Sequence, residues 1–127
     1  MSQEPYLGKI EVSPHAVVSI AGQAVLECYG VVGLATRHLH DEFAEILPGA
    51  SFRRGVQVTV HDGTIVVDLY VVIQYGTRVS EVAEGIKNRV RYSVQHATGL
   101  PVEAVNVHVQ GLRVSQDDEP GGAVNNP

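Results

Sequence analysis

The sequence has few of the residues on which disulfide-linked, thiolate-metal or membrane-spanning proteins rely. Cys28 is the one cysteine among 127 residues, so neither a disulfide nor a thiolate metal site can form within the chain. Tryptophan is absent and aromatic residues make up only 6%. Apolar runs fall far short of the roughly 20 residues that a membrane span requires. These absences predict a protein in a reducing compartment that does not insert directly into a membrane.

Positive charge is also scarce. Nine Lys and Arg stand against 14 Asp and Glu, which gives a formal charge of -5. Nucleic-acid binding depends on net basicity, so nucleic acid is not expected as a partner. Met1 to Gly8 contain no basic region and no apolar region of the kind that makes a signal peptide, so a cytoplasmic protein is predicted.

The chain has the length of one domain. Residues 1–7 are expected to be a flexible N-terminus, and residues 8–114 a single folded domain. Residues 115–127 combine acids, Gly, Asn and Pro with little to bury, so they are expected to be a disordered acidic tail.

The first half of the domain predicts a strand, a long helix and a short helix. Gly8–Val12 alternates apolar and polar residues, which indicates a half-buried strand. Ser13-Pro14 is a good helix start, and Gly30 is placed to end that helix. Asp41–Leu47 predicts two helical turns that stop before a proline.

A β-hairpin is predicted around Asp62-Gly63, a strong two-residue turn signal. With these residues at the tip, every apolar residue of the first strand faces an apolar residue of the second. A one-residue slip destroys this match, so the register is well specified. The predicted pairs are His61 with Thr64, Val60 with Ile65, Val58 with Val67, and Val56 with Leu69.

A second helix and a last strand complete the domain. The helix is predicted to open at Thr77 or Ser80 and to end at Thr98-Gly99. Val105–Val109 alternates and predicts the strand. The resulting fold class is α+β, a small mixed sheet in the order strand, helix, short helix, hairpin, helix, strand, with two main helices packed on one face.

Five stretches, in this order and spacing, resemble the alkaline-shock-protein, or envelope-stress-response, family of mainly Gram-positive bacteria. They are Gly8–Ser13, Ala24–Leu34, Gly55–Val60, Ile65–Val72 and Thr98–Val109. The resemblance implies a small cytoplasmic protein linked to cell-envelope homeostasis, which self-associates or is held at the membrane by a separate anchor protein. It implies no catalytic residue set. The segment Arg37–His40 and the acidic tail depart from the family pattern.

The leading hypothesis is therefore a non-enzymatic interaction or scaffold protein that uses no cofactor. It would act by self-association and through a membrane-linked partner, at the inner face of the membrane. The predicted contact surface is Val66, Tyr70 and Val72, which lie on the face of the second hairpin strand opposite Val67 and Leu69. The alternative is that residues 31–52 fold over them.

Two histidines suggest a different chemistry. His38 and His40 lie on one side of an extended segment, and Asp41 could complete a divalent metal site in a small metal-dependent enzyme. The simpler interpretation is a polar loop in which Asp41 caps a helix. His108 shares a strand side with Asn106 and is expected to be a hydrogen-bonded residue of the sheet face.

Three further patterns leave alternatives open. Gly30-Val31-Val32-Gly33 is similar to the backbone clamp of KH-type RNA-binding modules, but the favoured interpretation is a helix stop followed by a buried connector, because both middle residues are Val and the chain has no net positive charge. Arg53, Arg54 and Arg78 flank the hairpin and would contact an anion or acidic partner if they met at one end of the sheet; otherwise they form a solvated surface. Cys28 is expected to be a structural thiol.

Overall fold

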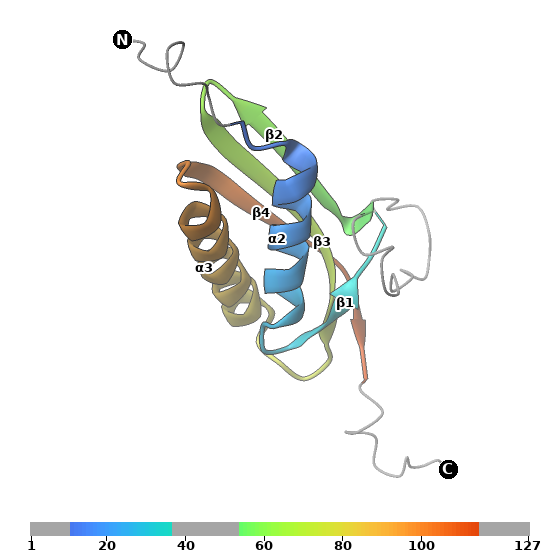
Figure 1. Ribbon diagram of the computed structural model, residues 1–127. Coiled ribbons are helices and arrows are strands. Elements are labelled where there is room, and N and C mark those ends of the chain that lie inside the picture. The colour runs from blue at the N-terminus through green and yellow to red at the C-terminus, as the bar shows by residue number, and fades with distance from the viewer. Residues whose placement is uncertain (1–10, 37–53, 115–127) are drawn as a thin grey trace, which may run out of the picture.

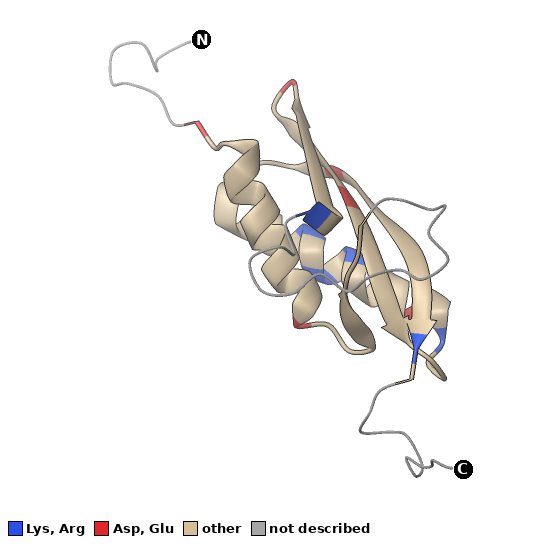
Figure 2. Ribbon diagram, turned by 90° about the vertical axis from the view of Figure 1, so that its right-hand side faces the viewer, with Lys and Arg blue, Asp and Glu red and all other residues tan. Residues whose placement is uncertain are grey.

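The computed structural model describes residues 11–36 and 54–114, which form two layers, a pair of helices and a sheet (Figures 1 and 2). This confirms the predicted α+β class. The elements in chain order are α2 (Pro14–Leu26), β1 (Val31–Leu34), β2 (Val56–His61), β3 (Thr64–Gln74), α3 (Val79–Thr98) and β4 (Val102–Arg113).

Strand β3 is the centre of the sheet. Both β2 and β1 pair antiparallel with it, β2 along its first half and β1 along its last residues. On its other side β3 pairs in parallel with β4, to which it is connected through α3. The sheet is therefore mixed, as predicted, and the single long strand carries all three strand pairings.

The predicted hairpin register is confirmed at every position. His61 pairs with Thr64, and the pairing continues without a shift to Val56 with Leu69. Both turn residues adopt left-handed backbone angles, with φ of 52° at Asp62 and 79° at Gly63. Asn, Asp and Gly tolerate this conformation, which is why the dipeptide marks the turn.

The core lies between the two helices and one face of the sheet. Alternate residues of β3 point into it because successive side chains of a strand point to opposite faces. Helices α2 and α3 cover them with one face each. The fully buried side chains of this core include Ile65, Val67, Leu69, Val71 and Ile73 from β3, Val17 and Val25 from α2, and Ile86, Val90 and Val94 from α3.

Helix α2 begins where the sequence predicts and ends earlier than predicted. The Ser13 Oγ accepts a hydrogen bond from the Ala16 amide at 3.2 Å, and Pro14 occupies the first turn. The helix stops at Leu26 rather than continuing to Gly30. The reason is that the chain must reverse at Gly30, with φ of 86°, to enter β1.

The structure describes only the end of the first predicted strand and none of the predicted short helix. Residues 8–10 of the predicted strand lie outside the described residues, and Glu11 and Val12 belong to no strand. The predicted helix Asp41–Leu47 also lies outside the described residues. Strand β1 was not predicted, because its four residues show no alternation and its partner is the distant end of β3.

Helix α3 confirms the predicted end and refines the start. Its first residue is Val79, after Arg78 as N-cap. Gly99 follows its last residue in the left-handed conformation, with φ of 78°, as a glycine C-cap requires.

Alanine substitutions at two glycines can distinguish the cost of a strained backbone from the cost of steric crowding. Gly30 and Gly99 both have positive φ, but a Cβ on Gly30 would lie 2.7 Å from Val82 Cγ2, whereas a Cβ on Gly99 would meet nothing within 4 Å. Val82 is itself buried and cannot move aside freely.

We expect Gly99→Ala to lower the free energy of unfolding by about 1 kcal/mol, the cost of a left-handed backbone. Gly30→Ala should lower it by at least about 2 kcal/mol, because crowding of Val82 adds to the same backbone cost. Urea denaturation of both variants provides the measurement. Equal losses in the two variants would show that the Gly30 turn is not packed against α3 as described.

Candidate interaction site

The sheet face turned away from the helices presents the side chains of β3 that do not enter the core. Val66, Asp68 and Tyr70 alternate with the core residues and are half-buried. Val72, the third member of the predicted contact surface, is fully buried and does not belong to the cluster under the helices. Of the predicted surface, Val66 and Tyr70 therefore retain solvent-accessible area.

A polar network joins β3 to β4 on this face. The parallel register places Asp68 beside Asn106 and Tyr70 beside His108. Asp68 Oδ1 accepts a hydrogen bond from Asn106 Nδ2 at 3.1 Å and lies 3.1 Å from His108 Nε2. The expectation of a hydrogen-bonded sheet-face histidine is thus confirmed.

The same histidine stacks on Tyr70. The ring centroids of Tyr70 and His108 are 4.5 Å apart and the ring planes differ by 11°. His108 is therefore held on two sides, by Asp68 and by Tyr70. Sequence reasoning selected Tyr70 but missed its stack on His108 and the contacts of His108 and Asn106 with Asp68. The reason is that the β3–β4 register depends on a 27-residue crossover that no local pattern fixes.

The rest of this face is polar and almost free of charge. Gln57 and Thr59 of β2 are exposed opposite Asp68 and Val66. Gln110 Nε2 donates to the Thr36 carbonyl at 3.0 Å. The charged residues within the four strands are Asp68, Glu103 and Arg113.

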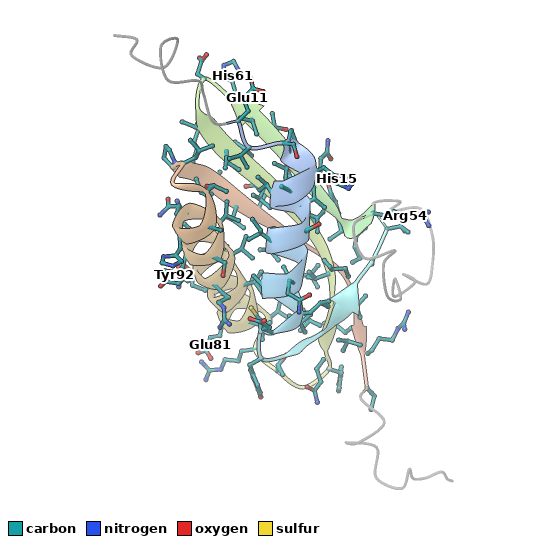
Figure 3. The ribbon with its side chains drawn as sticks, in the orientation of Figure 1. Glu11, His15, Arg54, His61, Glu81 and Tyr92 are labelled. Atoms are coloured by element: carbon teal, nitrogen blue, oxygen red, sulfur yellow. The ribbon has the colours of Figure 1, made fainter. Side chains whose placement is uncertain are left out.

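The structure does not bring the predicted arginines together. Arg53 lies outside the described residues. Arg54 precedes β2, which begins opposite Leu69, whereas β3 continues for five more residues toward Arg78. Arg78 contacts Glu81 at 3.0 Å, and Figure 3 shows Glu81 far from Arg54.

The residues of the predicted metal site are not among those that the structure describes. His38, His40 and Asp41 are outside the described residues, so the predicted metal site stays a prediction. Within residues 11–36 and 54–114, no three His, Cys, Asp or Glu side chains lie together in a way that would hold a metal ion.

A cleft of about 530 Å³ opens at the end of the molecule where α2 finishes and α3 begins. Two ion pairs line it, Arg89 with Glu27 and Arg78 with Glu81, so its formal charges cancel. Burial raises the pKa of the Cys28 thiol in its wall, and the Arg89 charge offsets this in part. The other lining residues are Tyr29, Gly76, Thr77, Val82 and Gly85.

The chain as a whole matches one known family. The sequence model of the alkaline shock protein 23 family, described as having a cell envelope-related function, matches residues 2–114. The chain belongs to the alkaline shock protein 23 family. This confirms the resemblance noted from the sequence.

Bacterial relatives agree with this assignment. Protein YloU of Bacillus subtilis (strain 168) is 41% identical over 109 residues, which cover 85% of this chain and 91% of YloU. Protein Spy1614 of Streptococcus pyogenes is 36% identical over 108 residues, covering 84% and 89%. A stress response regulator gls24 homolog of Streptococcus pyogenes is 27% identical over 112 residues, covering 88% of this chain and 63% of the relative.

Among solved structures, a zinc form of a MamM CTD variant aligns over 79% of this chain and 87% of its own, with 15% identity and a TM-score of 0.49. A likeness at this level carries no inference about function.

Two further observations concern this family member's relation to RNA and membranes. Gly30 is a turn residue and Val31–Leu34 form β1, so the segment similar to a KH clamp is not a loop open to phosphate. None of the described helices is long and apolar enough to cross a membrane.

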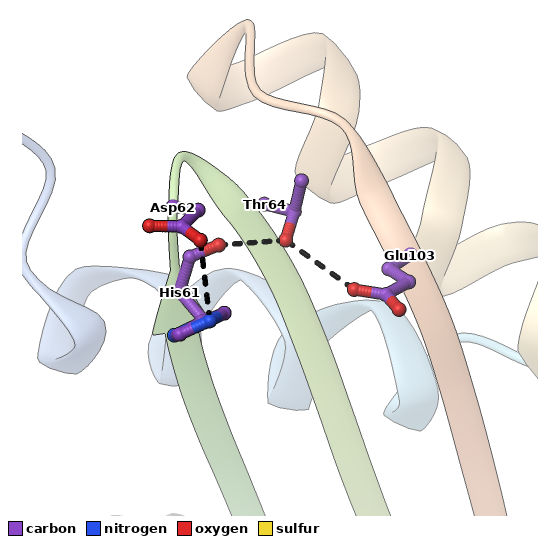
Figure 4. A network of polar contacts seen from close by, with 4 residues as sticks. All are labelled: His61, Asp62, Thr64 and Glu103. Atoms are coloured by element: carbon purple, nitrogen blue, oxygen red, sulfur yellow. Dashed lines mark hydrogen bonds and ion pairs between the residues drawn. The ribbon is translucent and has the colours of Figure 1, made fainter.

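The described residues include two Asp–His pairs that differ in exposure. Asp68 and His108 are 3.1 Å apart on the half-buried sheet face. His61 Nε2 and Asp62 Oδ2 are 3.3 Å apart at the hairpin tip, with side chains 78% and 86% exposed. At the tip, the Thr64 hydroxyl also donates to the His61 carbonyl at 2.8 Å, and Glu103 Oε1 lies 3.4 Å from the same hydroxyl (Figure 4).

We expect a double-mutant cycle of Asp68→Ala and His108→Ala to give a coupling free energy of about 0.5–1 kcal/mol, because partial burial limits screening by water. The same cycle on His61 and Asp62 should give no measurable coupling. Denaturation midpoints of the single and double variants provide both values. A coupling at the tip as large as that on the sheet face would contradict the ordered Asp68 network.

Proposed function

We propose that this family member is a non-enzymatic interaction protein of a cell envelope-related process. It acts from the cytoplasm by self-association and through a membrane-linked protein partner. The observation that carries the proposal is the Asp68–His108–Tyr70 network on a sheet face that neither α2 nor α3 covers.

The composition of this face suits a protein contact. Protein interfaces are depleted in charge at their centres and enriched in aromatic residues, Tyr among them. Tyr70 supplies a large ring, and the stack on His108 restrains it before any partner binds. A side chain already held in place loses less conformational entropy on association, which favours binding.

A second copy is a compatible occupant of the face. The only carboxylate that β3 places there, Asp68, already has Asn106 and His108 as partners. Two such faces packed together would therefore not confront bare like charges, which would oppose association. The exposed amide and hydroxyl of Gln57 and Thr59 supply the polar rim that such contacts usually have.

We expect Tyr70→Asp to lower the assembly state of the protein by adding an unpaired charge at the centre of the face. Thr59→Arg, at an exposed position of the same face, should act in the same direction without disturbing the Tyr70 stack. Sedimentation over a concentration series measures the mass.

Tyr29→Asp is the control, because Tyr29 is 81% exposed and lies just after the C-terminal end of α2, away from the sheet face. It adds the same charge and should leave the mass unchanged. If neither sheet-face variant changes the mass while the wild type assembles, the face is not the contact.

The membrane-linked partner predicts a separate result. Purified protein should sediment with membrane vesicles prepared from a bacterium that carries the family, and not with protein-free vesicles of the same lipids. Protease treatment of the native vesicles should abolish sedimentation. Equal binding to both kinds of vesicle would replace the protein partner with a direct lipid contact.

A further inference from the structure

Strand β4 forms one edge of the sheet. It runs for 12 residues, Val102–Arg113, and β3 pairs with one of its sides. In the described part of the chain, no strand pairs with its other side. An edge strand presents a row of main-chain donors and acceptors that another strand can bind.

The hairpin register shows which main-chain groups of β4 point outward. The main-chain N–H and C=O of Thr64, which closes the two-residue turn, bond to β2. The main-chain groups of the alternate residues Ile65, Val67 and Leu69 therefore point the other way and bond to β4. The Ile65 amide indeed donates to the Pro101 carbonyl. In a parallel ladder such residues bond to the neighbours of their paired residue. Their partners Val105 and Val107 therefore point N–H and C=O away from β3, as does Val109 by the same alternation.

Helix α3 covers only the start of this edge. The Val102 amide donates to Gln95 Oε1 at 3.1 Å, and the Val102 carbonyl accepts from Arg91 Nη1. Among the described residues, no comparable side chain reaches the outward groups of Val105, Val107 or Val109. Within the described ranges, side chains of α3 therefore bond only to Val102 at the start of β4, and not to the part of the strand that follows.

The exposed edge also lacks the usual protection against pairing. Natural edge strands are commonly kept short, or carry charges or proline. Between Ala104 and Leu112 this strand has no charged residue and no proline. The register of the β3–β4 pairing shifts at two places, between Ile65 and Val66 and between Val71 and Val72 of the partner strand, and the stretch Ala104–Val109 that pairs between them is free of bulges.

We propose that the open edge of β4 pairs antiparallel with β4 of a second copy, about a twofold axis at Val107. The proposal deepens the self-association in the proposed function and assigns it a second surface, distinct from Tyr70. It joins the two sheets into one continuous sheet.

The sequence of β4 is self-complementary in this register. Val107 faces its own counterpart, and Val105 faces Val109 of the other copy, so valines meet on the helix side. Asn106 faces His108 on the open side. Cross-strand pairs of β-branched residues stabilise a sheet, and no like charges are opposed. An isologous twofold contact requires this kind of self-complementary patch.

In the Tyr70→Asp background, which lacks the sheet-face contact, we expect Val107→Pro to convert the β4-paired dimer to a monomer, measured by sedimentation, with at least a tenfold rise in the dissociation constant. Proline removes the outward N–H of Val107 and no bond to β3, and edge strands tolerate proline in that orientation. Val60→Pro is the matched control: it lies on β2 with its N–H likewise directed away from β3, and should leave the dimer intact.

Amide hydrogen exchange of the wild-type protein provides a test that needs no variant. The amides of Val105, Val107 and Val109 should exchange slowly at high protein concentration and rapidly after dilution, whereas amides of β3 should stay protected throughout. Fast exchange of these three amides at every concentration overturns the proposal, as does their protection at every concentration in a monomer.

The two self-contacts are distinguishable. Tyr70→Asp should leave concentration-dependent protection of the β4 amides unchanged, and Val107→Pro should abolish it. Loss of this protection in Tyr70→Asp, with no effect of Val107→Pro, would refute the β4 contact and leave the sheet face as the sole contact.

Discussion

The rest of the structure depends on the burial of one long strand, β3. Two helices cover one of its faces, and three other strands pair with it within the sheet. Strand β3 supplies five fully buried side chains to the core, and its main chain bonds to β1, β2 and β4. Because its odd-numbered residues are fixed in the core, its even-numbered residues must point to the other face. The position of Asp68 and Tyr70 is thus a consequence of hydrophobic packing on the opposite side of the same strand.

This constraint explains why the candidate contact surface is rigid. Asp68 and Tyr70 sit on the best-anchored strand, and their partners Asn106 and His108 sit on the strand that β3 pairs in parallel. The crossover through α3 sets that parallel register, and α3 in turn is held by Ile86, Val90 and Val94 in the core. A surface built on such elements keeps its shape better than one built on loops, which suits a protein whose function we assign to contacts.

Charge is placed where it does not interfere with those contacts. Most of the charged side chains that the structure describes lie on the helices and turns, as Figure 2 shows, and the cleft between α2 and α3 neutralises its own arginines with Glu27 and Glu81. The sheet face and the β4 edge are left nearly uncharged. The chain belongs to a family with a cell envelope-related function, and we propose that this member acts through such contacts. The two surfaces differ in kind, since one offers side chains and the other main-chain groups.

The sequence by itself determined the elements whose signals are local. The Asp62-Gly63 turn, the register of β2 with β3, the Ser13 cap and the Gly99 stop all depend on residues close together in the chain, and each was predicted. Tyr70 was predicted for the contact surface by simple alternation. Tertiary structure alone decided the early end of α2, the existence of β1, the burial of Val72 and the separation of Arg54 from Arg78. It also decided that Asp68 and His108 would meet. These features depend on which distant segment pairs with β3, and that choice follows from packing the whole core, which no short stretch of sequence encodes.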